Sequence, residues 1–251
     1  MKKREYQPDP SQKKNEEANL ERWQPKTELG RKVKKEEVTD IEVVLDSGKK
    51  ILEVEIVDKL LPDLASDMVM LGQAKGKFGG GQRRVFKQTQ KKTAEGNKPN
   101  FSLCLIVGNR NGIIGVGLGK AKETVPAREK AVRNSKLNVF KIRRGCGSWQ
   151  CGCKEAHSIP YTVYGKSGSV KIWLMPAPKG AGLKVQSEVK KMLELAGIKD
   201  AYSRTLGHTN TTINLVSAAE KALRQLLATK VASRYNEPLG LKEGVIREEA
   251  R

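Results

Sequence analysis

Apolar residues in the middle of the chain follow two spacings that predict its first folded layer. Runs of apolar side chains at 101–107 and 113–118 predict two strands. The 108–112 segment between them contains an Asn-Gly pair, which is typical of a tight hairpin turn. Helical spacing follows over 124–137, with Pro126 in the first turn. Two strands with a helix laid across them predict an α+β layer.

A second group of elements begins after residue 160. Apolar runs predict strands at 161–164, 170–175 and 201–205. Amphipathic spacing predicts helices at 185–196 and 212–227, and Gly197 ends the first helix. Two helices on one face of a small sheet predict a two-layer α/β domain.

The ends of the chain and the segment between the two groups differ in composition. Residues 1–40 mix both charges and contain three prolines, which predicts an arm that orders on a partner. The charged residues after 229 are expected to be loose. The predicted parts are an N-terminal arm at 1–40, short helices at 41–66, a first domain at 67–145, a cysteine-rich linker at 146–160, a second domain at 161–229 and a charged tail at 230–251.

Basic side chains are concentrated in one part of the chain. The net charge is +20, and residues 71–150 hold 18 basic but only three acidic side chains. Soluble surfaces normally mix the two signs, so this imbalance predicts a polyanion partner. The sequence contains no apolar run of about 18 residues and no apolar stretch after its basic N-terminus. We therefore expect a cytoplasmic protein with no membrane partner.

The glycine-rich stretch 75–87 combines backbone freedom with five cations, which suits a loop that follows an irregular RNA groove. Phe78 and Phe86 are suited to stacking on unpaired bases or to core packing, and core packing is favoured for Phe86. The residues predicted to contact RNA are Lys75, Lys77, Arg83, Arg84, Lys87, Arg110, Lys120, Lys122, Arg143 and Arg144.

Residues 115–120 read Gly-Val-Gly-Leu-Gly-Lys and invite a nucleotide-binding interpretation. A P-loop would need glycine at Ile114 and a hydroxyl residue at Ala121, so the motif fails. The glycines instead allow the backbone to come close to a phosphate group. Lys120 and Lys122 precede the predicted helix start. Together they predict a phosphate-binding corner.

Cys146, Cys151, Cys153 and His157 form a C-x4-C-x-C-x3-H pattern. Four such ligands within twelve residues are suited to one tetrahedral zinc ion, although the spacing is not that of a common zinc finger. The sequence therefore leaves two alternatives, a zinc site or a metal-free linker. Cys104 lies in a predicted strand and is expected to be a buried, inert thiol.

Catalysis has little support in the sequence. The chain contains two histidines, and residues 71–150 lack the paired carboxylates that two-metal nuclease chemistry requires. We expect no enzymatic activity.

Three separated segments resemble the family of the fifth small-subunit ribosomal protein. They are residues 112–123 (GIIGVGLGKAKE), 170–180 (VKIWLMPAPKG) and 195–200 (LAGIKD). Residues 144–153 (RGCGSWQCGC) resemble the archaeal branch of that family. The resemblance implies a first domain similar to double-stranded-RNA-binding domains and a second with a left-handed βαβ crossover.

The resemblance also implies a function as a structural constituent of the small ribosomal subunit. Members of this family bind small-subunit ribosomal RNA near the messenger entry channel and the decoding region. They support assembly and translational accuracy, and they contact the fourth small-subunit ribosomal protein and messenger RNA. The family's RNA-contacting loop falls on 75–87, and the 90–100 stretch is longer than its usual connection, which predicts an extended hairpin.

Two rival functions are a free double-stranded-RNA-binding regulator and an RNA-processing enzyme. The regulator would not need the Met-Pro-Ala-Pro segment at 175–178, and the enzyme would need clustered acids.

Overall fold

The computed structural model describes residues 20, 22–73 and 83–245. Its first domain contains a five-stranded antiparallel sheet with the order β1-β3-β4-β5, and β2 pairs with β3. The strands are β1 (Ala65–Val69), β2 (Lys87–Thr93), β3 (Gly96–Gly108), β4 (Ile113–Ala121) and β5 (Val139–Lys141). Helix α5 (Thr124–Leu137) packs on one face of this sheet and confirms the helix predicted at 124–137.

The second domain is built on a four-stranded sheet with the order β7-β8-β10-β9. Its strands are β7 (Val163–Ser167), β8 (Val170–Pro176), β9 (Leu183–Lys184) and β10 (Ala201–Leu206). Helix α6 (Ser187–Ala196) connects the parallel strands β9 and β10, and α7 (Thr212–Ala228) follows β10. Gly197 ends α6 in the left-handed conformation with φ 80°, as its position predicted.

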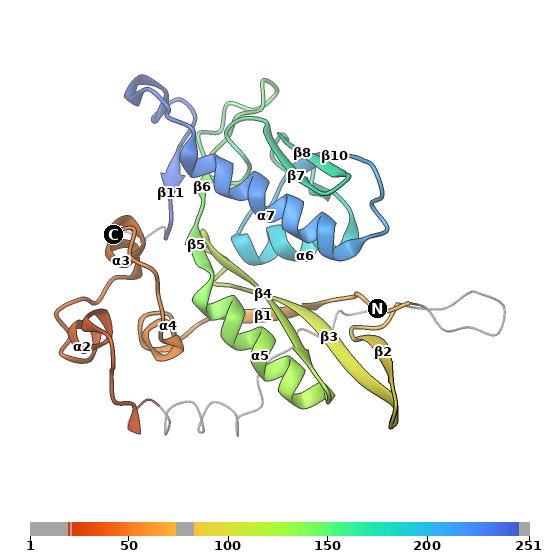
Figure 1. Ribbon diagram of the computed structural model, residues 1–251. Coiled ribbons are helices and arrows are strands. Elements are labelled where there is room, and N and C mark those ends of the chain that lie inside the picture. Colours follow the sequence, from red (N-terminus) through yellow and green to blue (C-terminus); the bar gives the residue numbers. More distant parts are fainter. Residues whose placement is uncertain (1–19, 21, 74–82, 246–251) are drawn as a thin grey trace.

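Helices α6 and α7 lie between the two sheets, so the domains share one core (Figure 1). On β3, Cys104 and Ile106 belong to the cluster that contains the α6 and α7 side chains. Leu103 and Leu105 belong to the cluster on the α5 side. Successive strand residues point to opposite faces, so a strand buried on both faces needs a continuous apolar run. The fold is α+β, as predicted, but the two domains are packed together.

The prediction that residues 1–40 form an arm that orders on a partner is wrong for residues 22–40. Helix α2 (Glu28–Lys34) forms there and packs near α3 (Ile41–Asp46) and α4 (Val54–Leu60). The Trp23 side chain is buried, and its Nε1 donates to Glu53 Oε2 at 2.8 Å. The backbone N–H groups of Lys26 and Thr27 donate to the other oxygen of Glu53. Burial raises the pKa of Glu53, but the hydrogen bonds from Thr27, Trp23 and Lys26 outweigh it and lower the pKa.

The prediction of a loose tail is wrong for residues 230–245, which we call the C-terminal strap. Strand β11 (Lys242–Glu243) pairs with β6 (Arg143–Arg144), and the Val245 N–H donates to Glu42 Oε1 at 2.6 Å. The Cys146 N–H donates to the Leu239 carbonyl at 2.7 Å. These bonds tie the strap to two distant segments, 143–146 and Glu42. The apolar spacing of the chain does not predict them.

The 90–100 stretch forms the distal part of the β2–β3 hairpin, whose last pair is Thr93 with Gly96. The ladder that starts at the Lys87–Ser102 pair runs through this stretch, whereas its length relative to other family members stays a prediction. Among the described residues, no helix has the length and hydropathy of a membrane-spanning segment.

Gly117→Ala tests the packing of β4 on α5. A Cβ at this position would overlap the Ser135 nitrogen and the Ala131 carbonyl oxygen, both in the helix backbone. We expect a loss of about 1–3 kcal/mol in the free energy of unfolding, measured by urea denaturation. Gly152→Ala is the control, because a Cβ there meets no atom within 4 Å. Equal stability of the two variants would contradict this packing.

Candidate metal centre and nucleic-acid interface

The three cysteines and the histidine of the linker meet at one point. One ligand atom from each of Cys146, Cys151, Cys153 and His157 lies within 4.8 Å of the other three. Around a tetrahedral zinc ion, neighbouring ligand atoms lie roughly 3.6 Å apart, as the usual zinc–sulfur and zinc–nitrogen distances require. The Cys151 Sγ and His157 Nε2 atoms are 3.8 Å apart, close to that value. The four donors therefore fit a zinc ion after a small contraction.

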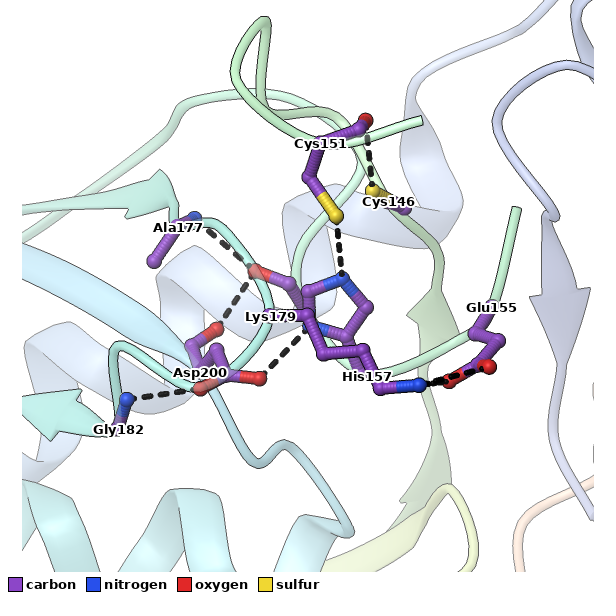
Figure 2. A network of polar contacts seen from close by, with 9 residues as sticks. Cys146, Cys151, Glu155, His157, Ala177, Lys179, Gly182 and Asp200 are labelled. Atoms are coloured by element: carbon purple, nitrogen blue, oxygen red, sulfur yellow. Dashed lines mark hydrogen bonds and ion pairs between the residues drawn. The ribbon is translucent and has the colours of Figure 1, made fainter. Parts of the chain in front are cut away.

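Asp200 holds the ring of His157 from the side opposite the cysteines (Figure 2). His157 Nδ1 and Asp200 Oδ2 are 2.8 Å apart, and both side chains are buried. Asp200 Oδ1 accepts a 2.7 Å hydrogen bond from the Gly182 N–H, which fixes the carboxylate. A carboxylate on Nδ1 leaves Nε2 available to a metal, the usual support for a ligating histidine. Sequence reasoning missed Asp200, because it lies 43 residues from His157.

The cysteine thiols of the cluster have different surroundings. Hydrogen bonds from the Lys179 and Cys153 backbones lower the pKa of Cys151 to about 6. Burial raises the pKa of Cys146 to about 11. Burial also raises the pKa of Cys104 to about 12 in the core, which supports its expected role as an inert thiol.

The surrounding backbone holds the cysteine loop closed. Gly145 and Ser158 form a two-way backbone bridge with both N–O distances at 3.0 Å. Gly147 lies against Pro160 so closely that a Cβ would overlap the Pro160 carbonyl. Lys179 and Glu155 form an exposed ion pair of 2.7 Å beside the cluster (Figure 2). Contacts within the protein therefore hold the cysteine-bearing loop between Gly145 and Ser158 closed.

Several residues predicted to contact RNA lie on the surface. Lys75, Lys77 and Phe78 fall outside the described residues. The exposed members of the predicted set are Arg83, Arg84, Lys87, Arg110, Lys120 and Lys122. Arg83 also donates to Thr212 Oγ1 at 3.0 Å, which ties the loop to the start of α7. Phe86 is partly buried against the α5-side core, as expected.

Arg144 does not belong to the surface set, and its prediction as an RNA contact is wrong. Its side chain is 3% exposed and donates to Asn111 Oδ1 at 2.8 Å and to the Gly244 carbonyl at 3.1 Å. Burial lowers its pKa to about 10. The neighbouring Arg143 side chain is mostly buried and donates to Glu243 and to the Thr229 carbonyl. Both arginines hold the C-terminal strap.

The predicted glycine-lined phosphate corner is also wrong. Gly115, Gly117 and Gly119 face α5, and a Cβ on any of them would overlap the helix backbone. The backbone of α5 therefore occupies the space beside these glycines, where a phosphate would have to lie. Lys120 and Lys122 remain exposed, but no glycine pocket accompanies them.

Sequence reasoning missed the cations of the β2–β3 hairpin. Lys91, Lys92 and Lys98 are all exposed. Their charge was visible in the sequence, but only the strand register determines which of them share a face.

Models of one known family match both domains. The model described as ribosomal protein S5, N-terminal domain, matches residues 81–143, and that of the C-terminal domain matches 165–234. The small ribosomal subunit protein uS5 of Nanoarchaeum equitans is 46% identical over 228 residues, which are 91% of this chain and 98% of that protein. Its counterpart in Methanocaldococcus jannaschii is 45% identical over 226 residues, 90% of this chain and 97% of that protein.

Proposed function

The chain belongs to the ribosomal protein S5 family, and from this premise we propose that it binds small-subunit ribosomal RNA near the messenger entry channel and the decoding region. It is a structural, non-enzymatic constituent of the small ribosomal subunit, of archaeal type, and it works in the cytoplasm on the ribosome. In that position it supports assembly and translational accuracy. Its expected neighbours are the fourth small-subunit ribosomal protein and messenger RNA.

The observation that carries the proposal is the order and extent of the family match. Both family domains are matched in sequence order, and the identity extends over about nine tenths of the chain. A free double-stranded-RNA-binding regulator would not require the second domain, yet this domain shares a core with the first. The exposed cations Arg84, Lys87 and Lys120 support binding to RNA phosphate.

Arg83→Ala with Arg84→Ala tests the contact with ribosomal RNA. We expect weaker binding to small-subunit ribosomal RNA, because two phosphate contacts are lost. The plot of log affinity against log salt should become less steep by about two. The measurement is filter binding at several salt concentrations.

The matched control for this pair replaces both arginines with lysine, which keeps the charge and should keep the slope. Urea denaturation checks the fold, because Arg83 also contacts Thr212. An unchanged salt slope in the folded alanine variant would contradict phosphate contacts at this loop.

We further propose that Cys146, Cys151, Cys153 and His157 bind one structural zinc ion. Four protein ligands complete a tetrahedral shell, so the metal would have no open position for catalysis. When bound, zinc supplies a cross-link within the linker. Asp200 orients His157 toward that ion, and the loop needs little rearrangement because its backbone is already closed.

The zinc proposal is tested by metal analysis of the purified chain. We expect about one equivalent of zinc per chain, and much less after Cys151→Ser, because one thiolate ligand is lost. Cys104→Ala is the control, since Cys104 lies in the core away from the cluster. Co²⁺ bound at a tetrahedral thiolate site absorbs visible light. We expect this absorption in the Co²⁺-loaded wild-type chain and its absence in the Co²⁺-treated Cys151→Ser variant. A wild-type zinc content below about a tenth of an equivalent would contradict the site.

A further inference from the structure

The sheet of the second domain has one covered face and one open face. Alternate strand residues, among them Val163, Ile172 and Leu174, belong to the core that contains the side chains of α6 and α7. Both helices lie between this sheet and the sheet of the first domain (Figure 1). Successive strand residues point to opposite faces, so the residues in between point away from the helices. We call this side the outer face, and its members are Tyr164, Lys166, Lys171, Trp173, Met175, Lys184, Tyr202, Arg204 and Leu206.

Strand register places Trp173 at the centre of the outer face. Its direct neighbours across the sheet are Tyr164 on β7 and Arg204 on β10. Lys171 and Met175 lie two residues away on its own strand and therefore share its face. The rings of Trp173 and Tyr164 contact each other, with their centroids 5.1 Å apart. The centre of the outer face is therefore aromatic and apolar.

The apolar side chains of the outer face remain accessible. Tyr164 is 38% exposed and Leu206 is 46% exposed, while Trp173, Met175 and Tyr202 are half-buried. A single exposed apolar residue is ordinary on a soluble protein. A group of large apolar side chains rimmed by polar ones instead marks a surface that binds a partner.

The rim of the outer face is basic. Lys166 and Lys171 are directly opposed on β7 and β8, and like charges in this position repel each other. Arg204 on β10 and Lys184 on β9 extend the rim, and all four side chains are exposed. Strands β7, β8, β9 and β10 contain no acidic residue. By charge complementarity, the rim fits a partner that carries negative charge.

The ring geometry favours an acidic protein segment over RNA. Bases bind aromatic side chains by stacking on open ring faces. The Lys184 ammonium lies over the Tyr202 ring, 5.3 Å from its centroid, and the Trp173 and Tyr164 rings are tilted by 44° against each other. A base would have to displace these side chains before it could stack. Tryptophan, tyrosine and arginine at a centre that polar residues surround are typical of the hot spots that bind proteins.

The dimensions of the outer face fit a short segment of chain. It spans four strands, and along β8 it extends from Lys171 to Met175. At the usual strand spacing and rise per residue, this is roughly 14 Å by 13 Å. An interface between two folded proteins buries about 800 Å² on each partner, which is several times more. About four or five residues of an extended chain would cover the outer face.

We propose that the outer face binds a short acidic segment of another protein, with one apolar side chain of that segment packed on Trp173. Carboxylates of the segment pair with Lys166, Lys171 and Arg204. The proposal goes beyond the proposed function, because it requires no contact with RNA and uses a face that is turned away from the first domain.

The test titrates the full-length chain with a short peptide of alternating glutamate and leucine and follows the amide resonances by NMR. We expect saturable shifts in β7, β8 and β10 and at the indole N–H of Trp173. A second peptide, with serine in place of each leucine, should bind at least about tenfold more weakly, because it lacks the apolar anchor.

Variants of the outer face test its two components separately. Leu206→Ser removes an exposed apolar side chain, and Lys171→Gln with Arg204→Gln removes two charges of the rim. Each change should weaken binding of the glutamate–leucine peptide by about threefold or more. Urea denaturation checks that each variant is folded.

The matched controls lie on α5, in the other domain. Val125→Ser also replaces an exposed apolar side chain, and Lys130→Gln with Arg133→Gln also removes one lysine and one arginine charge. Both controls should bind the peptide as the wild-type chain does. Equal losses in these controls would overturn the proposal, because any basic surface would then suffice.

The two remaining outcomes are equally decisive. If the peptide causes no saturable shift on the outer face, the proposal is wrong. If a short oligouridine shifts the same resonances at lower concentration than the peptide does, the face is an RNA site and the proposal is overturned. Neither result changes the salt slope by which the proposed function is tested.

Discussion

The docking of the β3–β4 turn on the end of α6 is the constraint on which the rest of the structure depends. The Arg110 and Gly112 N–H groups donate to the carbonyls of Leu195 and Ala196 at 2.9 and 3.1 Å. The last carbonyls of a helix have no partner within the helix, so the turn supplies the bonds that α6 lacks. A Cβ on Gly108 would overlap the Leu195 carbonyl. Glycine at this position thus allows the two domains to meet through their backbones.

This junction connects the two candidate sites of the molecule. Arg144 bonds to Asn111 in the turn and to Gly244 in the C-terminal strap, so the strap is anchored where the domains meet. Beyond α6 the chain reaches Asp200, which orients His157 in the cysteine cluster. The first domain's sheet continues outward into the β2–β3 hairpin, whose Lys91, Lys92 and Lys98 are exposed. These contacts hold the cysteine cluster and the basic β2–β3 hairpin at fixed positions relative to each other, which suits a protein whose role is structural.

The sequence predicted the regular elements well, because their signals are local. The helix at 124–137 and the stop at Gly197 follow from periodicity and capping alone. Contacts between residues that lie far apart in the sequence were not predicted. The bond from Trp23 to Glu53 spans 30 residues, and that from Val245 to Glu42 spans 203. Arg144 was predicted to contact RNA because of its charge, since composition does not distinguish a buried guanidinium from an exposed one. The cysteine cluster was predicted because its ligands are neighbours in sequence, whereas Asp200 was not.

Sedimentation of a lysate from cells that produce the chain is the most direct test of its place in the small ribosomal subunit. We expect the chain to travel with small subunits through a sucrose gradient and to leave them only when salt is raised, as phosphate contacts require. A chain that remains at the top of the gradient in low salt, while small subunits sediment normally, would contradict its place in the small ribosomal subunit.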